Sequence, residues 1–524
     1  MDVMATTPAT SAANQPPPLA GHNLFATDRV LVEALAREGG SPWESRIAAF
    51  GDALGGEPLE WGRLANEHPP TLRTHDRYGE RVDELEFHPA WDSLLRLGLD
   101  AQVQSLPWVD RRPGAHAARA ALFMLLGQVE AGVGCPLSMT FAALPALRAE
   151  PALAEEWIPR LTSGEALCGM AMTERQGGSD VRANETSAQP AGETWELTGH
   201  KWFCSAPMSD AFLVLAQAPA GLTCFLVERP QPGFQIDRLK DKLGNRSNAS
   251  AEIRLEGAVG RLVGEEGRGL RTILEMVNHT RLDCVLGSAA LMRRAVAEAT
   301  HHAAHRFAFG RLLVEQPLME NVLADLAVES EAATVTALRL ARAYDEGDHP
   351  FRRLATAVCK FWICKRTPPL VAEALECLGG NGYVEESQLP RLYRESPLNS
   401  IWEGSGNVNA LDVLRALGRE PEAVAAFVAE VELATGADRR LDAAVARLKD
   451  ELADTEELEP RARRVVERLA LALQGSLLVR HGDPAVADAF CASRLGDGGS
   501  VYGTLPPGLD LRSIVDRHRP RLAP

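Results

Sequence analysis

The sequence lacks the cysteine spacing of a disulfide framework or a zinc module. Its nine cysteines are scattered over 524 residues without one Cys-x-x-Cys pair, and both kinds of site need cysteines in regular, paired spacings. His301 and His305 have the i, i+4 spacing of metal ligands, but no nearby carboxylate or cysteine completes a site. We therefore predict no bound metal, a solvated or subunit-facing helix for these histidines, and a reducing, cytoplasmic location.

Long apolar runs are also missing. No stretch reaches the length of about 18 residues that a membrane-spanning helix needs. The N-terminus has no basic region followed by an apolar stretch, so a secretory signal is not expected either. The sequence predicts no membrane partner.

Positive charge is scarce. Lys and Arg number 55 against 71 Asp and Glu, a formal net charge of −16. The molecule as a whole therefore has no electrostatic footprint for nucleic acid or an anionic membrane, and any such partner needs a local basic patch. What is plentiful is apolar residues, at 45 % of the chain, enough for large cores in three or four domains.

The pattern of apolar residues divides the chain into five parts. Residues 1–24 resemble a disordered tail, and residues 25–166 have helical periodicity. Short β-rich runs separated by turn residues follow over 167–263 and predict a small antiparallel sheet, as a barrel or sandwich. Helical periodicity returns over 264–418 as a bundle and continues through 419–524. The predicted fold is α+β and mainly α, with bundle helices expected at Leu270–Val285, Ala289–Phe307 and Pro317–Tyr344.

Three segments combine residue types that suit a flat cofactor and an acid–base reaction. Gly169–Val181 places glycines and hydroxyls where the backbone could approach a heterocycle or a phosphate. His200–Ser205 sets aromatics beside small polar groups, and Asn399–Asn407 places Glu403 on a Gly-rich loop that opens a helix, as a general base requires. Each has an ordinary alternative when taken alone: a turn, a buried aromatic pair, and a helix-start carboxylate favoured by the dipole.

Together and in this order, the three segments resemble the acyl-CoA dehydrogenase family over about residues 25 to 418. Thr173-Glu-Arg-Gln-Gly-Gly-Ser-Asp180 is similar to the family's flavin loop, and Lys201–Ser205 is similar to its Lys-x-aromatic strand. Further matches are Lys242–Ser247, Arg306-x-x-Phe-Gly310, Gly379–Tyr383 and Trp402-Glu-Gly404. The resemblance implies Glu403 as the catalytic base for α,β-dehydrogenation of an acyl thioester.

The resemblance also implies bound FAD and a homotetramer built as a dimer of dimers. Arg306 would reach the diphosphate of a flavin bound by a neighbouring subunit, through contacts that Lys could not make bidentate. The residues implied to hold FAD are Met170, Thr173, Gly178, Ser179, Trp202, Phe203, Cys204, Ser205, Arg306, Gln316, Gly379, Gly380, Trp402, Ser405 and Asn407.

Two departures from the family pattern bear on the site. Glu376 and Pro317 stand where flavin-contacting glutamines are usual, and the neighbouring Gln316 substitutes for the second. Trp402 replaces the common Tyr beside the base, and its larger indole would narrow the substrate pocket. This disfavours long acyl-CoA chains.

The strings MTERQGGSDV, KDKLGNRSNAS, LPRLYRE and NSIWEGSGN, with the C-terminal extension, resemble an alkylation-response subgroup of this family. That likeness implies a surface for double-stranded DNA in the last domain. Residues 439–524 carry 14 basic and 13 acidic side chains, so basic groups are concentrated there, although a solvated helix face gives the same pattern. The predicted DNA contacts are Arg439, Arg440, Arg447, Lys449, Arg517, Arg519 and Arg521.

Three functions stay open on the sequence. The first is a DNA-associated flavoprotein that protects against alkylating agents, with weak or unknown acyl-CoA dehydrogenase activity on an acyl-CoA or a small alkylating substrate. The alternatives are a catabolic dehydrogenase for short or branched acyl-CoA and a non-catalytic DNA-binding flavoprotein. The presence of Glu403 argues against the last of these.

Overall fold

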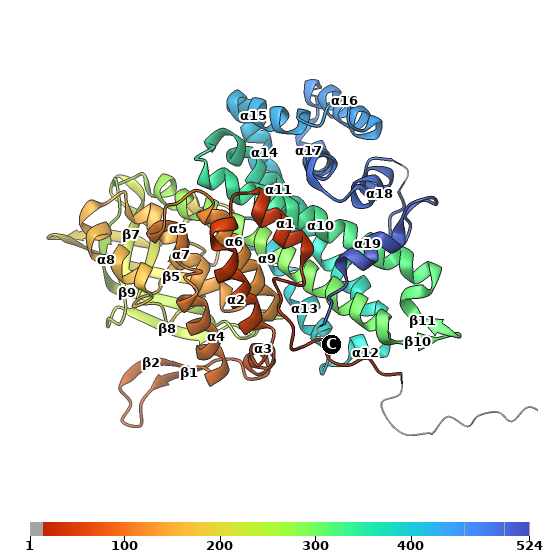
Figure 1. The fold of residues 1–524 in the computed structure, drawn as a ribbon. Coiled ribbons are helices and arrows are strands. Elements are labelled where there is room, and N and C mark those ends of the chain that lie inside the picture. Colours follow the sequence, from red (N-terminus) through yellow and green to blue (C-terminus); the bar gives the residue numbers. More distant parts are fainter. Residues whose placement is uncertain (1–13, 455, 497, 523–524) are drawn as a thin grey trace, which may run out of the picture.

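A computed structural model describes residues 14–454, 456–496 and 498–522 (Figure 1). It is mainly helical, with one sheet domain that comes between helical parts along the chain and lies at one side of the molecule, which confirms the predicted fold class. None of the helices in these ranges is both long and apolar enough to cross a membrane.

The N-terminal part is a layer of helices interrupted by a hairpin. Its helices are α1 (Arg29–Arg37), α2 (Glu44–Leu54), α3 (Pro58–Glu67), α4 (Pro89–Asp100), α5 (Leu106–Val109), α6 (Ala115–Val129), α7 (Gly134–Leu147) and α8 (Pro151–Ser163). The expectation of helix throughout was wrong at β1 (Thr71–His75) and β2 (Arg81–Glu86), which pair antiparallel. Asp76 turns the chain between them, because its carboxylate accepts the N–H groups of Tyr78 and Glu80 in the manner of an Asx turn.

The middle part is a seven-stranded sheet that closes on itself. Its strands are β3 (Cys168–Ala171), β4 (Ser187–Ala191), β5 (Thr194–Ser205), β6 (Ala211–Ala218), β7 (Gly221–Glu228), β8 (Phe234–Leu239) and β9 (Ser250–Leu262). The order is β3-β6-β4-β5-β9-β7, with β8 on β9 and β6 also paired to β7. The prediction of a purely antiparallel sheet was wrong at one edge, since β3 and β4 pair parallel to β6.

The bundle contains three long helices: α9 (Gly269–His305), α10 (Pro317–Asp345) and α11 (His349–Cys377). Two of the predicted helices are one, because α9 runs unbroken through Gly287 and Ser288. Gly287 allows close packing there, since a Cβ on it would lie 3.2 Å from Asn399 Nδ2. The smaller elements are β10 (Phe307–Ala308), β11 (Arg311–Leu312), α12 (Gly380–Tyr383), α13 (Gln388–Glu395) and α14 (Gly406–Arg419).

The C-terminal helices are α15 (Pro421–Glu432), α16 (Arg439–Ala453), α17 (Leu458–His481), α18 (Pro484–Arg494) and α19 (Leu511–His518). They share one hydrophobic core with the bundle. Phe427 of α15 stacks on Phe351 of α11, and Trp362 donates its indole N–H to Gln474 of α17. In Figure 1 the chain then returns across the bundle, where α19 packs against α10 and α1. Removing this part would therefore expose bundle core.

Cysteine chemistry plays no visible part in the architecture. All nine cysteines are unpaired and buried. Cys364, for example, accepts a hydrogen bond from Ser288 Oγ inside the bundle. These thiols therefore act as small apolar core residues.

Candidate functional site

Glu403 occupies a strained backbone conformation between two polar anchors. Its φ of 57° lies in the left-handed region, which only a few per cent of non-glycine residues adopt and which is enriched at functional sites. The Lys360 ammonium donates to the carbonyls of Trp402, at 2.8 Å, and of Gly404. Arg281 Nε donates to the carbonyl of Glu403 itself at 3.0 Å. The loop is therefore held from α11 and α9, and the carboxylate direction is fixed.

Among the described residues, one side chain donates a hydrogen bond to the carboxylate of Glu403. Thr280 Oγ1 donates to Glu403 Oε2 at 2.6 Å. Burial raises the pKa of Glu403 above its usual value, while the bond from Thr280 and the nearby charges of Lys360 and Arg281 oppose that rise. A carboxylate with a raised pKa is a stronger base, as proton abstraction requires.

A salt-bridge network behind the loop fixes its distance from α9. Arg281 Nη1 donates to Asp412 Oδ2 at 2.8 Å, and Arg353 Nη2 donates to Asp412 Oδ1 at 3.0 Å. Asp412 belongs to α14, so the network joins α9, α11 and α14 around the base. Sequence reasoning missed these residues, because their pairing spans 131 positions and no local pattern marks it.

The indole of Trp402 is also fixed. Its Nε1 donates to Asn399 Oδ1 at 2.9 Å, and Asn399 Nδ2 donates to Ser288 Oγ at 3.2 Å. The ring packs against the apolar cluster that contains Met139 and Met276. Trp402 is thus a rigid wall of the site rather than a mobile side chain.

The loop Thr173–Asp180, which is similar to the family's flavin loop, is joined to strand β5 by a buried ion pair. Lys201 Nζ donates to Glu174 Oε1 at 2.7 Å, with both side chains almost fully buried. The Trp202 N–H donates to the Thr173 carbonyl at 2.9 Å, which places the loop beside the strand aromatics. The Thr-Glu and Lys-x-aromatic motifs are therefore two halves of one structure.

In this loop the backbone of Gly178 lies so close to the Thr173 side chain that only glycine fits, and we call this close approach the Gly178 cradle. A Cβ on Gly178 would lie 2.5 Å from Thr173 Oγ1, so a side chain there would push Thr173 aside. Among the other side chains expected to contact the flavin, Met170 and Trp202 are partly buried, and Phe203 is 58 % exposed. An accessible aromatic beside close-packed backbone and hydroxyl groups fits a flat ring with a polar edge.

One predicted flavin contact is limited by burial. The Cys204 side chain is fully buried in the sheet core, and burial raises the pKa of its thiol to about 12. Only its backbone is left as a flavin contact. Ser205 Oγ instead lies 3.1 Å from Ser250 Oγ on strand β9, and it is partly accessible.

Arg306 lies far from Glu403. Thr280 and His305, the last residue of α9, are 25 residues apart, which corresponds to about 38 Å at 1.5 Å per residue. Arg306 is the residue after His305. Arg306 Nη1 donates to the Asn14 carbonyl at 2.5 Å, and Gln316 Nε2 donates to the Ala308 carbonyl at 3.0 Å. Gly379 and Gly380 begin α12, which borders the larger cavity described next.

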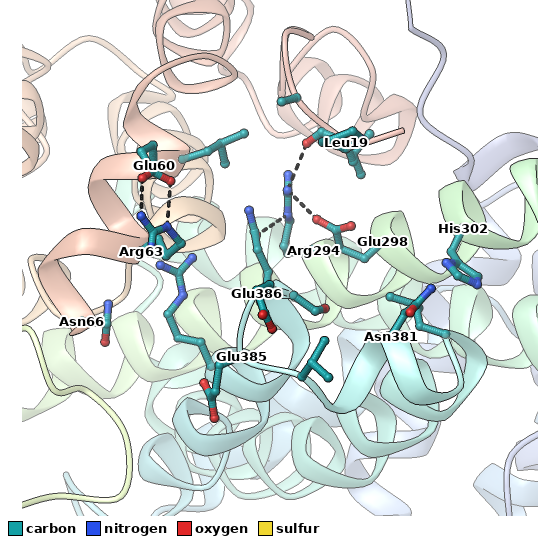
Figure 2. Close-up of a pocket in the computed structure, with 18 of the residues that line it drawn as sticks. Leu19, Glu60, Arg63, Asn66, Arg294, Glu298, His302, Asn381, Glu385 and Glu386 are labelled. Carbon is teal, nitrogen blue, oxygen red and sulfur yellow. Dashed lines mark hydrogen bonds and ion pairs between the residues drawn. The ribbon is translucent and has the colours of Figure 1, made fainter. Parts of the chain in front are cut away.

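That cavity is large, and its lining includes neither Glu403 nor Thr280. It measures about 1160 Å³ and lies between α3, the C-terminal half of α9, and the segment from α12 to α13, with the chain around Leu19 across it. Figure 2 shows two of its guanidinium groups matched to carboxylates, Arg63 to Glu60 and Arg294 to Glu298. Arg394 is likewise paired, with Glu385. We assign it no chemistry.

A second cavity, of about 730 Å³, lies along the start of α9. It is lined by the basic side chains of Arg182, Arg268 and Arg271. Asn278 lies on the same outward face of α9 as Arg271, whereas Thr280 is buried on the opposite face. This cavity therefore runs along the outward face of α9 and does not face the base.

The histidines near the end of α9 differ in exposure: His305 is exposed, as the expected solvated or subunit-facing helix requires, and the two before it are not. His301 and His302 are buried, and His301 Nε2 lies 2.8 Å from the Pro17 carbonyl. Burial lowers the pKa of His302 to about 4. The described residues contain no cluster of His, Cys, Asp and Glu able to hold a metal ion.

The seven predicted DNA contacts fall into two groups. In the first, Arg440 pairs with Asp438 and Asp488, Lys449 pairs with Glu432, and Arg447 donates to the Leu495 carbonyl. Arg517 is committed more deeply, to Glu33 and Glu331 in the α19 contact, and is not accessible enough for a phosphate. In the second group, Arg439, Arg519 and Arg521 form no ion pair within the described ranges.

Three family models match the chain. Residues 14–165 match the adaptive response protein AidB N-terminal domain, and residues 169–258 and 267–418 match the middle and C-terminal domains of acyl-CoA dehydrogenases. AidB of Escherichia coli strain K12 is 46 % identical over 515 residues, or 93 % of this chain and 95 % of that protein. The chain belongs to the acyl-CoA dehydrogenase family. This confirms the resemblance seen in the motifs.

Solved structures agree with this placement. Caenorhabditis elegans ACDH-11, in complex with C11-CoA, superposes with a TM-score of 0.87 at 29 % identity, covering 95 % of this chain and 96 % of that one. Bd2924 in its apo form gives 0.84 at 28 % identity, covering 90 % and 100 %. This acyl-CoA dehydrogenase is thus a flavoprotein and an oxidoreductase acting on CH–CH bonds.

Proposed function

We propose that this acyl-CoA dehydrogenase uses Glu403 to remove the α proton of an acyl-CoA thioester, with FAD as its cofactor. The observation that carries the proposal is the geometry of Glu403: a partly buried carboxylate of raised pKa, held in a left-handed conformation by Lys360 and Arg281. The α C–H bond is weakly acidic, so its cleavage needs a base of raised pKa and donors that stabilise the enolate oxygen.

The chain's own groups would hold FAD at two places. Thr173 and Ser179 supply hydroxyls beside the Gly178 cradle, and Ser405 and Asn407 supply polar groups where α14 begins. The chemistry that FAD supplies when bound is acceptance of the β hydrogen with two electrons. Trp402, fixed by Asn399, excludes water from the space next to Glu403, and this keeps the carboxylate poorly solvated.

The cavity at the start of α9 suits the CoA portion of the substrate. Arg182, Arg268 and Arg271 line it and would meet phosphate groups with charge-assisted hydrogen bonds. The thioester end of such a substrate would have to pass from this outward face of α9 to the buried face, where Thr280 contacts Glu403.

The decisive experiment is flavin reduction by short acyl-CoA thioesters in Glu403→Gln. The amide is nearly isosteric but cannot accept the proton, so reduction should be about 100- to 10,000-fold slower than in wild type while FAD stays bound. Glu155→Gln, an exposed glutamate on α8, is the control and should match wild type. Equal rates in Glu403→Gln and wild type would show that Glu403 is not the base.

We propose further that the enzyme is a homotetramer in which Arg306 contacts the FAD of a neighbouring subunit. Arg306 is about 38 Å from Thr280 along α9, too far to serve the site of its own chain. The elements beside it expose apolar side chains that a partner subunit would cover: Phe307, Phe309, Leu318, Tyr383 and Val384. Phe309 is 97 % exposed at a φ of 52°.

The test compares Arg306→Ala with Arg311→Ala, an exposed arginine on the same hairpin. FAD content and sedimentation are measured on both. Arg306→Ala should lose FAD and dissociate, and Arg311→Ala should do neither. A colourless wild-type tetramer would contradict the coupling of cofactor and assembly.

We also propose that the protein binds double-stranded DNA through its C-terminal arginines and takes part in protection against alkylating agents. The match of residues 14–165 to the adaptive response protein supports the second part. The contacts kept in this proposal are Arg439, Arg519 and Arg521, which have no carboxylate partner in the described ranges. Four subunits could join such groups into one positive surface despite a net charge of −16 per chain.

DNA binding is measured by gel shift against salt. Log affinity should fall with log salt by about 0.9 per phosphate neutralised, equally for all sequences. The triple variant Arg439→Ala, Arg519→Ala, Arg521→Ala should bind weakly. A control triple with the same charge change, at Arg77, Arg111 and Arg311, should bind like wild type. If both triples bound DNA as wild type does, the C-terminal assignment would be wrong.

A further inference from the structure

Ser205 is the last residue of β5 and lies on the accessible face of that strand. Phe203 is exposed and Ser205 is partly so, while Cys204 between them is fully buried, as alternation along a strand requires. The N–H of Trp202 donates to the first carbonyl of the loop Thr173–Asp180 at 2.9 Å. The Ser205 hydroxyl therefore shares a face with an accessible aromatic ring, at the end of the strand that this loop contacts.

A second serine contacts the Ser205 hydroxyl. Ser250, the first residue of β9, is the partner of Ser205 in the sheet, and the two Oγ atoms are 3.1 Å apart. Ser250 is only 5 % exposed, so its hydroxyl hydrogen needs an acceptor inside the protein. In the part of the chain that the structure describes, Ser250 Oγ has one further hydrogen-bond partner, and that partner is a donor.

The donor is Lys242, in the loop that joins β8 to β9. Its Nζ donates to Ser250 Oγ at 3.0 Å and to the Asn248 carbonyl at 2.6 Å. An ammonium group can only donate, so Ser250 Oγ accepts from Lys242 and donates its own hydrogen to Ser205 Oγ. The hydrogen of Ser205 is then left to point away from Ser250, toward the accessible face of β5.

The Cys135 thiol of α7 also lies beside Ser205. Burial raises the pKa of this thiol to about 11, so it is neutral at pH 7, and a neutral thiol sulfur is a weak acceptor. A ring nitrogen or carbonyl is therefore the stronger acceptor for the Ser205 hydrogen.

Lys242 adds a positive charge to these two hydroxyls. Over residues 14–454, 456–496 and 498–522 its ammonium forms no ion pair. Burial lowers the pKa of Lys242 to about 8, and the charges of Glu395 and Glu130 oppose that change, so the ammonium stays mainly protonated at pH 7. A partly buried charge without a partner costs stability, which favours a role for Lys242 in the site.

The Lys242 loop is held by two other parts of the chain. The backbone N–H and the Nδ2 group of Asn245 donate to the Glu395 carboxylate of α13 at 2.6 and 2.9 Å. Ser247 Oγ donates to Oε1 of Glu130, the residue after α6, at 2.8 Å. These contacts fix the loop, and with it the position of the ammonium.

We propose that Lys242, acting through Ser250, orients the Ser205 hydroxyl as a donor to the polar edge of the bound flavin and raises the reduction potential of that flavin. The inference rests on the proposed function, because it concerns the FAD of that same site. Flavin gains negative charge when it is reduced, so a hydrogen-bond donor and a nearby positive charge stabilise the reduced form. Lys242 is a positioning residue, since it acts through two hydroxyls.

The test measures the reduction potential of the flavin at pH 7, with the FAD-containing protein equilibrated against a dye of known potential. Lys242→Met should lower the equilibrium constant for two-electron reduction at least about tenfold, which is a fall of about 30 mV. Ser250→Ala keeps the cation, removes a single oxygen and should also lower the constant. In the double variant the two losses should not add, because both changes interrupt the same hydrogen-bond chain.

Arg254→Met is the matched control. It removes the same charge from β9, where Arg254 pairs with Asp237 and Glu256 at the surface. It should leave the potential unchanged. FAD affinity is measured on every variant by equilibrium dialysis, so that a change in potential is compared only between proteins that hold FAD. Ser250→Ala tests the hydrogen-bond chain even where Lys242→Met does not fold.

The outcomes separate the claims. If wild type holds FAD but Ser250→Ala leaves the potential unchanged, the hydrogen-bond chain is overturned and the proposed function stands. If Lys242→Met folds and keeps the wild-type potential, or if Arg254→Met lowers the potential as much as Lys242→Met does, the role of Lys242 is overturned. If wild type binds no FAD, the proposed function fails and this inference fails with it.

Discussion

Replacing Lys201 by methionine tests the ion pair that anchors the flavin loop. In wild type, Lys201 Nζ donates to Glu174 Oε1 and to the Leu215 carbonyl, each at 2.7 Å. Methionine keeps most of the apolar stem but removes the cation. Glu174 is then left as an uncompensated charge in a side chain that has no exposed surface.

The expected cost follows from that burial. Breaking a buried ion pair by removing one partner costs about 3–5 kcal/mol, whereas an exposed pair is worth about 0–1 kcal/mol. Glu174 also accepts the N–H groups of Glu185, at 2.6 Å, and of Thr186, at 3.2 Å, so the loop end at Glu185 should loosen with it. Lys201→Met should therefore lower both the free energy of unfolding and the affinity for FAD.

Urea unfolding, followed by tryptophan fluorescence, measures the first effect, and equilibrium dialysis against FAD measures the second. The double variant Lys201→Met, Glu174→Gln should recover part of the stability, because no charge is then left buried. Lys449→Met is the control, since Lys449 pairs with Glu432 at the surface. A loss below about 1 kcal/mol in Lys201→Met, the value typical of a surface pair, would refute the reasoning.

Three other outcomes are expected. Gly178→Ala should weaken FAD binding about tenfold by displacing Thr173. Gly56→Ala is the control, because Gly56 has open space around it, and it should leave FAD binding unchanged. An unchanged FAD affinity in Gly178→Ala would contradict the role of the close contact between Gly178 and Thr173. Thr280→Val removes a hydrogen bond that lowers the pKa of Glu403, so the pH profile of flavin reduction should move to higher pH, while Thr300→Val on the same helix leaves it in place. Burial alone would raise the pKa of Glu331, but His518 and Arg517 lower it to about 2. The ionised Glu331 therefore stabilises the fold above about pH 4.5, and the free energy of unfolding should fall by about 3 kcal/mol as pH falls from there toward 2. In Glu331→Gln the free energy of unfolding should depend less on pH over that range, and an unchanged pH dependence would contradict this role.

Local patterns predicted more than long-range partners did. The order of helical and sheet segments follows from periodicity, and the Glu403 loop and the Thr173–Asp180 loop were found because their residues are adjacent in the chain. The hairpin at Thr71–Glu86 was missed because its turn depends on one aspartate, Asp76, inside a helical region.

Residues whose role depends on a distant partner could not be foreseen. Arg517 was predicted to contact DNA, yet Glu331, 186 positions earlier, holds it. Asp412 was not singled out at all, although it joins Arg281 and Arg353 behind the base. The charge and spacing of residues along the chain do not indicate which carboxylate pairs with which guanidinium in the folded protein.

The same limit applies to the buried ion pair between Arg119 and Asp283, which are 164 positions apart in the chain. Only the packing of α6, α7 and α9 brings Arg119, Asp283 and Phe141 together.

The most direct measurement of the central claim is exchange of the α hydrogen of a bound thioester. Butyryl-CoA deuterated at the α carbon is incubated with the FAD-containing protein in water, and loss of deuterium from that carbon is followed by NMR. Wild type should wash the label out, and Glu403→Gln should do so at least about 100-fold more slowly, because the amide cannot accept a proton. Washout at the wild-type rate in Glu403→Gln would contradict the assignment of Glu403 as the base.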